Sequence, residues 1–215
     1  MIKRIIFDLD DTLITWKDEY WKALNRALDE LKIQYNLELV EDIKNAIGDY
    51  EKNSQHYNKK DILIHINKCT RLTLKIDFIE LWLKNLENCI EEEVEKSHVL
   101  KELAKKYELV VLTNWFRKCQ VERLENTGWL KFFDEVYDAE DYPKKPYKES
   151  YIRAMGNNKP NECIMIGDSY ENDVKKPLEI GMNAIYYNPK KHVEGCMVAK
   201  NFNDIFKLIL QLEKQ

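Results

Sequence analysis

The sequence predicts an α/β protein in which a doubly wound parallel sheet carries an inserted, all-helical cap domain. Short, unbroken apolar runs alternate with amphipathic segments at the beginning and in the second half of the chain. Residues 15–91 show helical periodicity instead, with no convincing strand. Strands that alternate with helices form a parallel sheet that is covered on both faces. We therefore expect a core of residues 1–14 and 92–215 and a helical cap of residues 15–91.

Five apolar runs predict the strands of the sheet. Each run is brief, rich in branched or aromatic residues, and without the two-residue alternation of a half-exposed strand. Because both faces of such strands are buried, we expect them to pair in parallel. The runs are residues 5–7 (IIF), 109–112 (LVVL), 135–137 (EVY), 163–166 (CIMI) and 184–187 (AIYY).

Four amphipathic segments predict the helices of the core. We expect Ser97 to cap the first of them, and Gly128 and Gly156 to follow the ends of the next two. Pro177 falls inside a further helix expected after the fourth strand, so that helix should start late or kink. The four segments are residues 97–106, 117–126, 149–155 and 203–213.

The insert contains three stretches of helical periodicity. Apolar side chains recur at steps of three and four within residues 16–31 and again within residues 40–47, where Gly48 is expected to end the helix. Asp77 and Glu80 resemble a capping box that opens a third helix. Since the insert follows the first strand, we expect it to lie directly above the carboxyl end of that strand.

Composition restricts the class of partner. The chain has 215 residues, a net charge of -4 and 44% hydrophobic residues, which predicts a soluble globular protein. It lacks the surplus of Lys and Arg that nucleic acids or anionic membranes require.

The apolar run at the N-terminus ends at Asp8, too early for a secretory signal, so we expect a cytoplasmic protein. The five cysteines are odd in number and lack metal-ligand spacing, so we expect reduced and mostly buried thiols.

Three carboxylates are crowded within four positions after the first strand, in IIFDLDDT (residues 5–12). A turn or a helix cap needs only one such residue. Asp8 and Asp10 are two residues apart, so they leave the end of the strand side by side on one face. Ligands bind at this edge of doubly wound sheets. A divalent cation would relieve the repulsion, and ligands that are all oxygen favour magnesium.

A calcium-binding loop is the alternative for this cluster. Asp8, Asp10, Thr12 and Glu19 fall at positions one, three, five and twelve of an EF-hand loop. The sixth position is Leu13 instead of the required glycine, and no helix precedes the loop. Both facts disfavour the EF-hand.

Polar side chains also follow three further predicted strands. Thr113 and Asn114 offer a hydroxyl and an amide to an oxyanion, Lys145 offers a positive charge, and Asp168 and Asp173 offer metal ligands. Each group alone is typical of an ordinary turn or surface. Their occurrence at successive strand ends indicates a single site.

These motifs resemble those of the haloacid dehalogenase-like (HAD) hydrolase superfamily. The family pattern has DxDx[TV] after the first strand, Ser or Thr after the second, Lys usually before Pro, and GDxxxD or a near variant after the fourth. The resemblance covers nearly the whole chain and implies a Rossmann-like core with a helical cap. Of two adjacent lysines, Lys145 directly precedes Pro and is the family-like choice. The matching segments are DLDDT (8–12), LTN (112–114), KKP (144–146) and GDSYEND (167–173).

The resemblance implies a role for each motif residue. Asp8 would be the nucleophile that forms an aspartyl phosphate, and Asp10 would be the general acid and then the base that activates water. Mg²⁺ would be held by Asp8, the main-chain carbonyl of Asp10 and Asp168, with Asp173 in support, either directly or through water. The residues that would bind the phosphoryl oxygens are Thr113, Asn114 and Lys145.

The second aspartate of the motif favours phosphoester hydrolysis. Dehalogenases release a halide, which needs no proton, and typically lack this residue, whereas Asp10 is present here. The sequence therefore predicts a magnesium-dependent phosphatase for a small phosphorylated metabolite. A haloacid dehalogenase or a phosphomutase on the same fold remains an alternative. A phosphoacceptor domain of the response-regulator type, whose acceptor lies on the third strand, or an inactive scaffold is less favoured.

Residues that flank the motifs are candidates for substrate specificity. Trp16, Tyr20, Trp115 and Arg117 are close enough in sequence to line the mouth of the site. Packing in the core is the alternative for the aromatic residues. Similar proteins hydrolyse phosphoglycolate, nucleoside monophosphates and sugar phosphates, and the sequence does not choose among these substrates.

Overall fold

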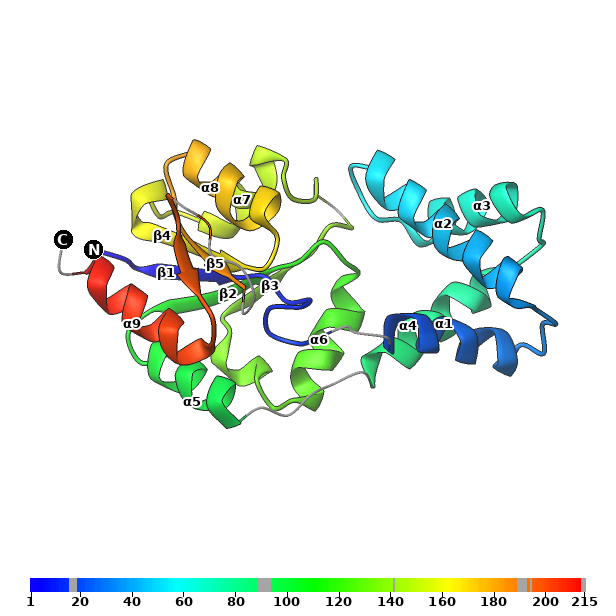
Figure 1. Cartoon of the computed structure of the whole chain (residues 1–215), viewed down its shortest axis with the longest axis horizontal. Helices are drawn as coiled ribbons and strands as arrows, with labels where there is room; N and C mark the ends of the chain where they lie inside the picture. The colour runs from blue at the N-terminus through cyan, green and yellow to red at the C-terminus, as the bar shows by residue number, and fades with distance from the viewer. Residues whose placement is uncertain (16–18, 89–93, 141, 189–192, 194, 214–215) are drawn as a thin grey trace.

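The computed structural model describes residues 1–15, 19–88, 94–140, 142–188, 193 and 195–213. Within these residues the chain forms a six-stranded sheet with helices on both faces, and the helices α1 to α4 stand beside it as a separate group (Figure 1). The first strand lies in the middle of the sheet and precedes these four helices in the chain. The helical insert therefore follows the carboxyl end of a central strand.

All neighbouring strands of the sheet pair in parallel, in the order β3-β2-β1-β4-β5-β6. The five predicted strands are confirmed. The sequence does not predict β6, a three-residue edge strand with only one fully buried residue. Strand order reverses between β1 and β4, which is where doubly wound sheets bind ligands. The strands are β1 (Arg4–Phe7), β2 (Glu108–Leu112), β3 (Glu135–Tyr137), β4 (Cys163–Gly167), β5 (Asn183–Tyr187) and β6 (Met197–Ala199).

The helices divide between the insert and the two faces of the sheet (Figure 1). The insert contains α1 (Glu19–Glu30), α2 (Leu37–Asn53), α3 (Lys59–Thr70) and α4 (Ile76–Glu87). The core helices are α5 (Val94–Leu103), α6 (Arg117–Asn126), α7 (Lys148–Met155), α8 (Lys176–Glu179) and α9 (Phe202–Leu212). Three short helical turns complete the core, namely η1 (Leu130–Phe132), η2 (Pro160–Glu162) and η3 (Tyr170–Lys175).

Two predicted helix starts have different outcomes. Ser97 lies inside α5 and does not cap it, because its Oγ accepts a hydrogen bond of 2.6 Å from Nε1 of Trp129. The expectation at Pro177 is confirmed: η3 ends at Lys175, and α8 then begins with Pro177 in its first turn. A proline is tolerated there because the first helical N–H groups have no partner within the helix.

Two predicted helix boundaries in the insert are wrong. Gly48 does not end α2, which continues to Asn53, because the buried Tyr50 extends its apolar face past the glycine. Asp77 does not cap α4. It lies in the first turn, and Lys75 occupies the cap position.

Buried apolar residues form separate clusters in the insert and under the sheet. The insert cluster contains residues from α1 to α4, and also Trp115 and Phe116, which follow β2. The insert is thus packed against the loop after β2, at the carboxyl edge of the sheet. No helix among the described residues is both long and apolar enough to span a membrane.

The cysteines differ in exposure. Cys119 and Cys163 are buried, whereas Cys196 is half-buried and Cys69 is exposed. Cys89 lies outside the described residues. The expectation of mostly buried thiols therefore holds for two of the four cysteines that the structure describes.

Candidate active site

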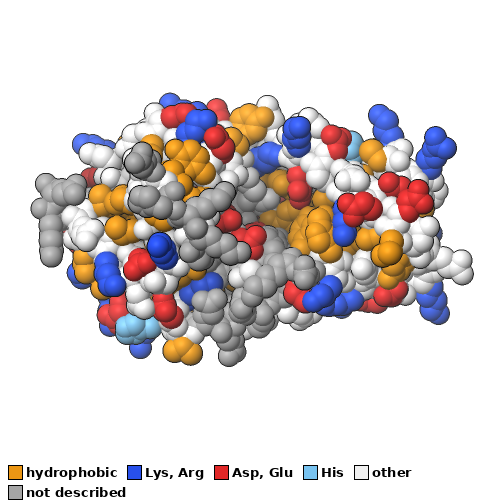
Figure 2. Space-filling view, in the orientation of Figure 1, with side chains coloured by type: hydrophobic (Ala, Val, Ile, Leu, Met, Phe, Trp, Pro, Cys, Tyr) orange, Lys and Arg blue, Asp and Glu red, His pale blue; other side chains and the backbone are white. Residues whose placement is uncertain are grey.

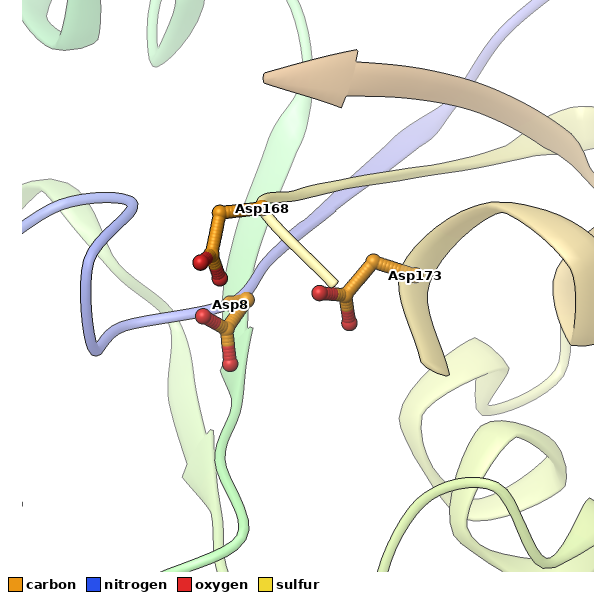
Figure 3. Close-up of side chains that lie close together, drawn as sticks. All are labelled: Asp8, Asp168 and Asp173. Carbon is orange, nitrogen blue, oxygen red and sulfur yellow. The ribbon is translucent and has the colours of Figure 1, made fainter. Parts of the chain in front are cut away.

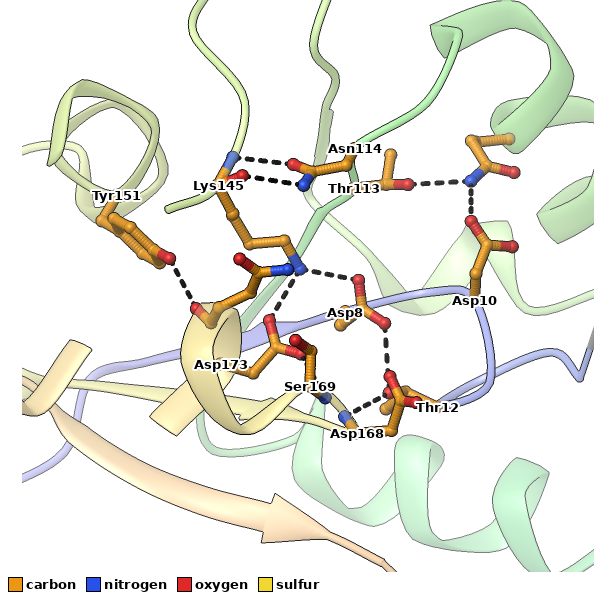
Figure 4. Close-up of polar contacts among 12 residues, drawn as sticks. Asp8, Asp10, Thr12, Thr113, Asn114, Lys145, Tyr151, Asp168, Ser169 and Asp173 are labelled. Atoms are coloured by element: carbon orange, nitrogen blue, oxygen red, sulfur yellow. Dashed lines mark hydrogen bonds and ion pairs between the residues drawn. The ribbon is translucent and has the colours of Figure 1, made fainter. Parts of the chain in front are cut away.

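The carboxyl edge of the sheet gathers the predicted residues from distant parts of the chain (Figure 4). Asp8 follows β1, Thr113 and Asn114 follow β2, and Asp168 follows β4. Asp8 is hydrogen-bonded into the sheet, because its N–H donates to the carbonyl of Ile166 at 2.8 Å. The parallel register of β1, β2 and β4 is what brings these side chains together.

Lys145 joins two of the aspartates. Its Nζ lies 2.7 Å from Oδ1 of Asp8 and 2.7 Å from Oδ1 of Asp173, and all three residues are buried. Burial lowers the pKa of Lys145, but the two carboxylates outweigh that effect and raise the pKa above its ordinary value. Lys145 is therefore a fixed positive charge in the floor of the site.

Asp8, Asp168 and Asp173 form the acidic cluster of the site (Figure 3). One oxygen from each lies within 4.8 Å of the others. Burial, with the nearby Asp8 and Asp173, raises the pKa of Asp168 to about 7, and burial with Asp8 raises the pKa of Asp173 to about 6. Lys145 opposes both shifts without cancelling them. The three carboxylates thus carry more negative charge than Lys145 alone offsets, and their oxygen donors fit a divalent cation such as Mg²⁺.

Thr12 and Gly167 hold the acidic cluster in shape. Oγ1 of Thr12 donates to Oδ2 of Asp8 at 3.1 Å and accepts from the N–H of Asp168 at 3.0 Å, so it connects the loops after β1 and β4. A Cβ on Gly167 would collide with the carboxylate of Asp173. Thr12 ends the DLDDT motif and Gly167 begins the GDSYEND motif. Packing around the carboxylates explains why these two residue types occur at those positions.

Asp10 faces away from the acidic cluster, toward α6 (Figure 4). Its Oδ2 accepts a hydrogen bond of 2.6 Å from Nε2 of Gln120, and its Oδ1 pairs with the guanidinium of Arg123. Nε2 of Gln120 also donates to Oγ1 of Thr113 at 2.8 Å. Burial raises the pKa of Asp10 to about 6, with a further contribution from Asp8, although Arg123 opposes the shift.

Gln120 and Arg123 are two site residues that the sequence did not predict. They are spaced i, i+3 on α6 and are fully buried together with Cys119 and Leu124. Long polar side chains on the buried face of a helix are the signal that identifies them, because such groups need partners. Here the partner is the carboxylate of Asp10.

The side chain of Asn114 lines the cavity and is also bonded to the main chain of Lys145. Its Oδ1 accepts from the N–H of Lys145 at 2.7 Å, and its Nδ2 donates to the carbonyl of Lys145 at 2.9 Å. The amide thus holds the main chain of Lys145, and only one N–H of Nδ2 is left for a phosphate oxygen. The buried hydroxyl of Thr113 accepts from Gln120, so its own proton remains to be donated.

A cavity of about 340 Å³ lies over the aspartates, between the sheet and the insert. Figure 2 shows a hollow here in which acidic side chains adjoin an apolar surface. Of the predicted specificity residues, Tyr20 and Trp115 line the cavity, whereas Trp16 lies outside the described residues. The insert also lines the cavity with three residues that were not predicted, namely Trp21, Glu51 and Tyr57.

Arg117 does not line this cavity. Its guanidinium pairs with Oε1 of Glu135 at 2.6 Å and also contacts the carbonyl of Val136. These bonds hold the first turn of α6 against β3. The position of Arg117 outside the cavity therefore gives no support to a role in substrate specificity.

Residues 5–187 match the family model of the haloacid dehalogenase-like hydrolases. The chain belongs to this family. The glyceraldehyde 3-phosphate phosphatase of Methanothermobacter thermautotrophicus is 26% identical, in an alignment that covers 95% of this chain and 94% of that protein. A phosphatase is therefore among the relatives of this HAD-like hydrolase.

Solved structures support the same fold. The HAD-hydrolase YfnB of Bacillus subtilis, solved with magnesium, superposes with a TM-score of 0.78 at 17% identity, covering 97% of this chain and 99% of that one. The 2-haloacid dehalogenase of Pseudomonas syringae pv. Tomato DC3000 gives a TM-score of 0.78 at 23% identity, covering 98% and 99%. Because a hydrolase solved with magnesium and a haloacid dehalogenase share this fold, the reaction has to be argued from the side chains.

Proposed function

We propose that this HAD-like hydrolase is a magnesium-dependent phosphatase that acts on a small phosphomonoester through an aspartyl phosphate on Asp8. The observation that carries the proposal is a pair of carboxylates with different surroundings above one sheet edge. Asp8 lies in the acidic cluster beside Lys145, and Asp10 is held separately by Gln120 and Arg123. This separation suits one nucleophile and one acid or base.

The proposed reaction has two steps. A carboxylate oxygen of Asp8 attacks phosphorus, the bond from phosphorus to the leaving alcohol breaks, and Asp10 gives its proton to that alcohol oxygen. Asp10 then takes a proton from water, whose oxygen attacks phosphorus and releases Asp8. Lys145 and Thr113 stabilise the negative charge that builds up on the phosphoryl oxygens.

Mg²⁺ is the cofactor that the acidic cluster fits. Asp8 and Asp168 would hold it, with Asp173 in support and the main-chain carbonyl of Asp10 as a further ligand. When bound, the cation would neutralise charge on the phosphate group and so allow an anionic nucleophile to approach it.

The insert of residues 15–91 is proposed to act as a cap domain over a core of residues 1–14 and 92–215. Side chains of α1 and α2, and of the segment that follows α2, line the same cavity as the aspartates. A cap in this position would exclude water and would select the substrate. The proposed partner of the protein is therefore a small molecule.

A dehalogenase is the competing function on this fold, and Asp10 argues against it. Release of a halide requires no proton donor, yet Asp10 is held by two buried side chains of α6. Burying charged groups in this way costs free energy of folding, which favours a functional role for the carboxylate.

Removal of the metal is expected to abolish phosphatase activity. In excess EDTA, hydrolysis of p-nitrophenyl phosphate should fall by about 100-fold or more and return on addition of Mg²⁺. Asp168→Ala should raise the Mg²⁺ concentration for half-maximal activity by about tenfold or more. Asp42→Ala, on the exposed face of α2, is the matched control and should leave this concentration unchanged. Full turnover in EDTA would contradict the metal assignment.

A further inference from the structure

Glu51 brings a carboxylate from the insert into the active-site cavity. It lies near the end of α2 and lines the cavity together with Asp8 and Asp10. Among the described lining residues it is the one acidic side chain that the insert supplies. Burial raises the pKa of Glu51, the hydroxyl of Tyr20 and the charge of Lys144 oppose the shift, and the charge of Asp10 adds to it, which agrees with the two carboxylates facing the same space.

Aromatic packing fixes Glu51 in place. The hydroxyl of Tyr20 donates to Oε1 of Glu51 at 3.1 Å. The ring of Tyr20 is itself held edge-on by Trp82, with ring centres 5.3 Å apart, and lies 5.6 Å from the ring of Trp115. The position of Glu51 is therefore set by the buried core of the insert.

Lys144 braces the same part of the insert from outside the cavity. Its Nζ donates to the main-chain carbonyl of Glu51 and lies 5.7 Å from the centre of the Tyr57 ring. Lys144 does not line the cavity over the aspartates, whereas Tyr57 does. The phenol of Tyr57 stays neutral, because burial and Glu51 raise its pKa well above its ordinary value.

The part of the cavity away from the sheet therefore offers a hydrogen-bond acceptor and aromatic faces. A carboxylate only accepts hydrogen bonds, so it matches a hydroxyl or an ammonium group and opposes another carboxylate. The rings of Tyr20, Tyr57 and Trp115 can pack against carbon atoms of a ligand or against a cation.

We propose that Glu51 selects phosphomonoesters whose alcohol part carries a hydroxyl or ammonium donor, and rejects those whose alcohol part carries a carboxylate. The proposal rests on the phosphatase function proposed above and names its substrate class. The phosphate would lie at Lys145 and Asp8, and the donor group would reach Glu51 across the cavity.

Four phosphomonoesters that share a two-carbon chain test this selection. They are 2-hydroxyethyl phosphate, phosphoethanolamine, ethyl phosphate, which lacks a donor, and phosphoglycolate, whose second carbon is a carboxylate. For the unmodified enzyme we expect the two donor substrates to have a kcat/KM about tenfold higher than that of ethyl phosphate. Their kcat/KM should be about 100-fold higher than that of phosphoglycolate. The first two substrates distinguish a preference for hydroxyl from a preference for ammonium.

Glu51→Gln is expected to narrow the ratio of kcat/KM between 2-hydroxyethyl phosphate and phosphoglycolate by about tenfold, because it removes the charge and keeps the shape. Tyr20→Phe, which keeps the ring and removes the donor to Glu51, should narrow the same ratio to a smaller extent. Glu41→Gln makes the same change at an exposed position of α2 and should leave the ratio as it is. Damage to the fold would instead lower all rates together and leave the ratio unchanged.

The outcomes separate this proposal from the proposed function. If the unmodified enzyme hydrolyses the series but Glu51→Gln and Tyr20→Phe leave every ratio unchanged, the role of Glu51 is overturned and the phosphatase stands. If neither the series nor p-nitrophenyl phosphate is hydrolysed in the presence of Mg²⁺, the phosphatase function fails and the substrate class fails with it.

Discussion

Asp8→Asn is expected to abolish turnover in a protein that keeps its fold. An amide is a poor nucleophile toward phosphorus, so the rate of phosphate release should fall by about 10⁴-fold or more. Asparagine has nearly the same shape, and its side chain can still pair with the hydroxyl of Thr12 or with Lys145. Removing one of three crowded carboxylates also relieves repulsion with Asp168 and Asp173. Phosphate release and the thermal unfolding midpoint are the two measurements.

Asp11→Asn is the matched control for this substitution. Asp11 is exposed, and its φ of 59° lies in the left-handed region, which asparagine tolerates as well as aspartate does. The phosphatase activity of Asp11→Asn should stay within about twofold of that of the unmodified enzyme. If Asp8→Asn retained phosphatase activity close to that of the unmodified enzyme, a route through an aspartyl phosphate on Asp8 would be excluded.

The motif residues at the sheet edge could be predicted because topology alone brings them together. In a parallel sheet, the residue after each strand comes to the same edge whatever the intervening chain does. Asp8, Thr113 and Asp168 follow three adjacent strands, so their proximity depends only on correct strand assignment. The short apolar runs are enough for that assignment.

The insert side of the site could not be predicted in the same way. Glu51 and Tyr57 lie about forty residues or more from the nearest motif in sequence, in a segment whose pattern only indicates helices. Their place in the cavity depends on how the insert packs on Trp115 and Phe116. Tertiary packing of this kind leaves no local signal, which is also why Gly48 could not be recognised as the interior of a longer helix.

Asn114 and Arg123 illustrate a second limit. Sequence shows which polar groups are available, but the number of hydrogen bonds left for a ligand depends on partners in the fold. The amide of Asn114 is used largely by the main chain of Lys145, and Arg123 has Asp10 as its counter-ion. Both side chains thus hold a neighbouring group in place, and Asn114 keeps one N–H for a ligand.

Asp10→Asn is expected to make the rate depend strongly on the leaving group. The variant keeps the nucleophile but lacks both the proton donor and the base that activates water. With an alkyl phosphate, whose alkoxide needs a proton, formation of the aspartyl phosphate should slow by about 100-fold or more. With p-nitrophenyl phosphate, whose leaving group needs none, transfer to Asp8 should persist while hydrolysis stalls. A burst of about one equivalent of nitrophenol, followed by slow release, is the expected time course.

The surroundings of Asp10 require a stability control in the same experiment. Asparagine would place an NH₂ group against Nε2 of Gln120 or against Arg123, both of which are donors. Gln120 could turn its own amide to compensate only by losing the bond of 2.9 Å from Arg123 to its Oε1. A loss of about 1–3 kcal/mol in the free energy of unfolding is therefore expected, and activity should be measured well below the unfolding midpoint.

A general loss of structure and the loss of a proton donor give different results with the two substrates. Partial unfolding would lower the burst amplitude with p-nitrophenyl phosphate, whereas loss of the acid and base preserves the burst and slows only the later phase. If Asp10→Asn hydrolysed alkyl and aryl phosphates at the rates of the unmodified enzyme, Asp10 could not be the general acid. The choice of a phosphatase over a dehalogenase would then lose its main support, because that choice depends on a proton donor, which the release of a halide does not need.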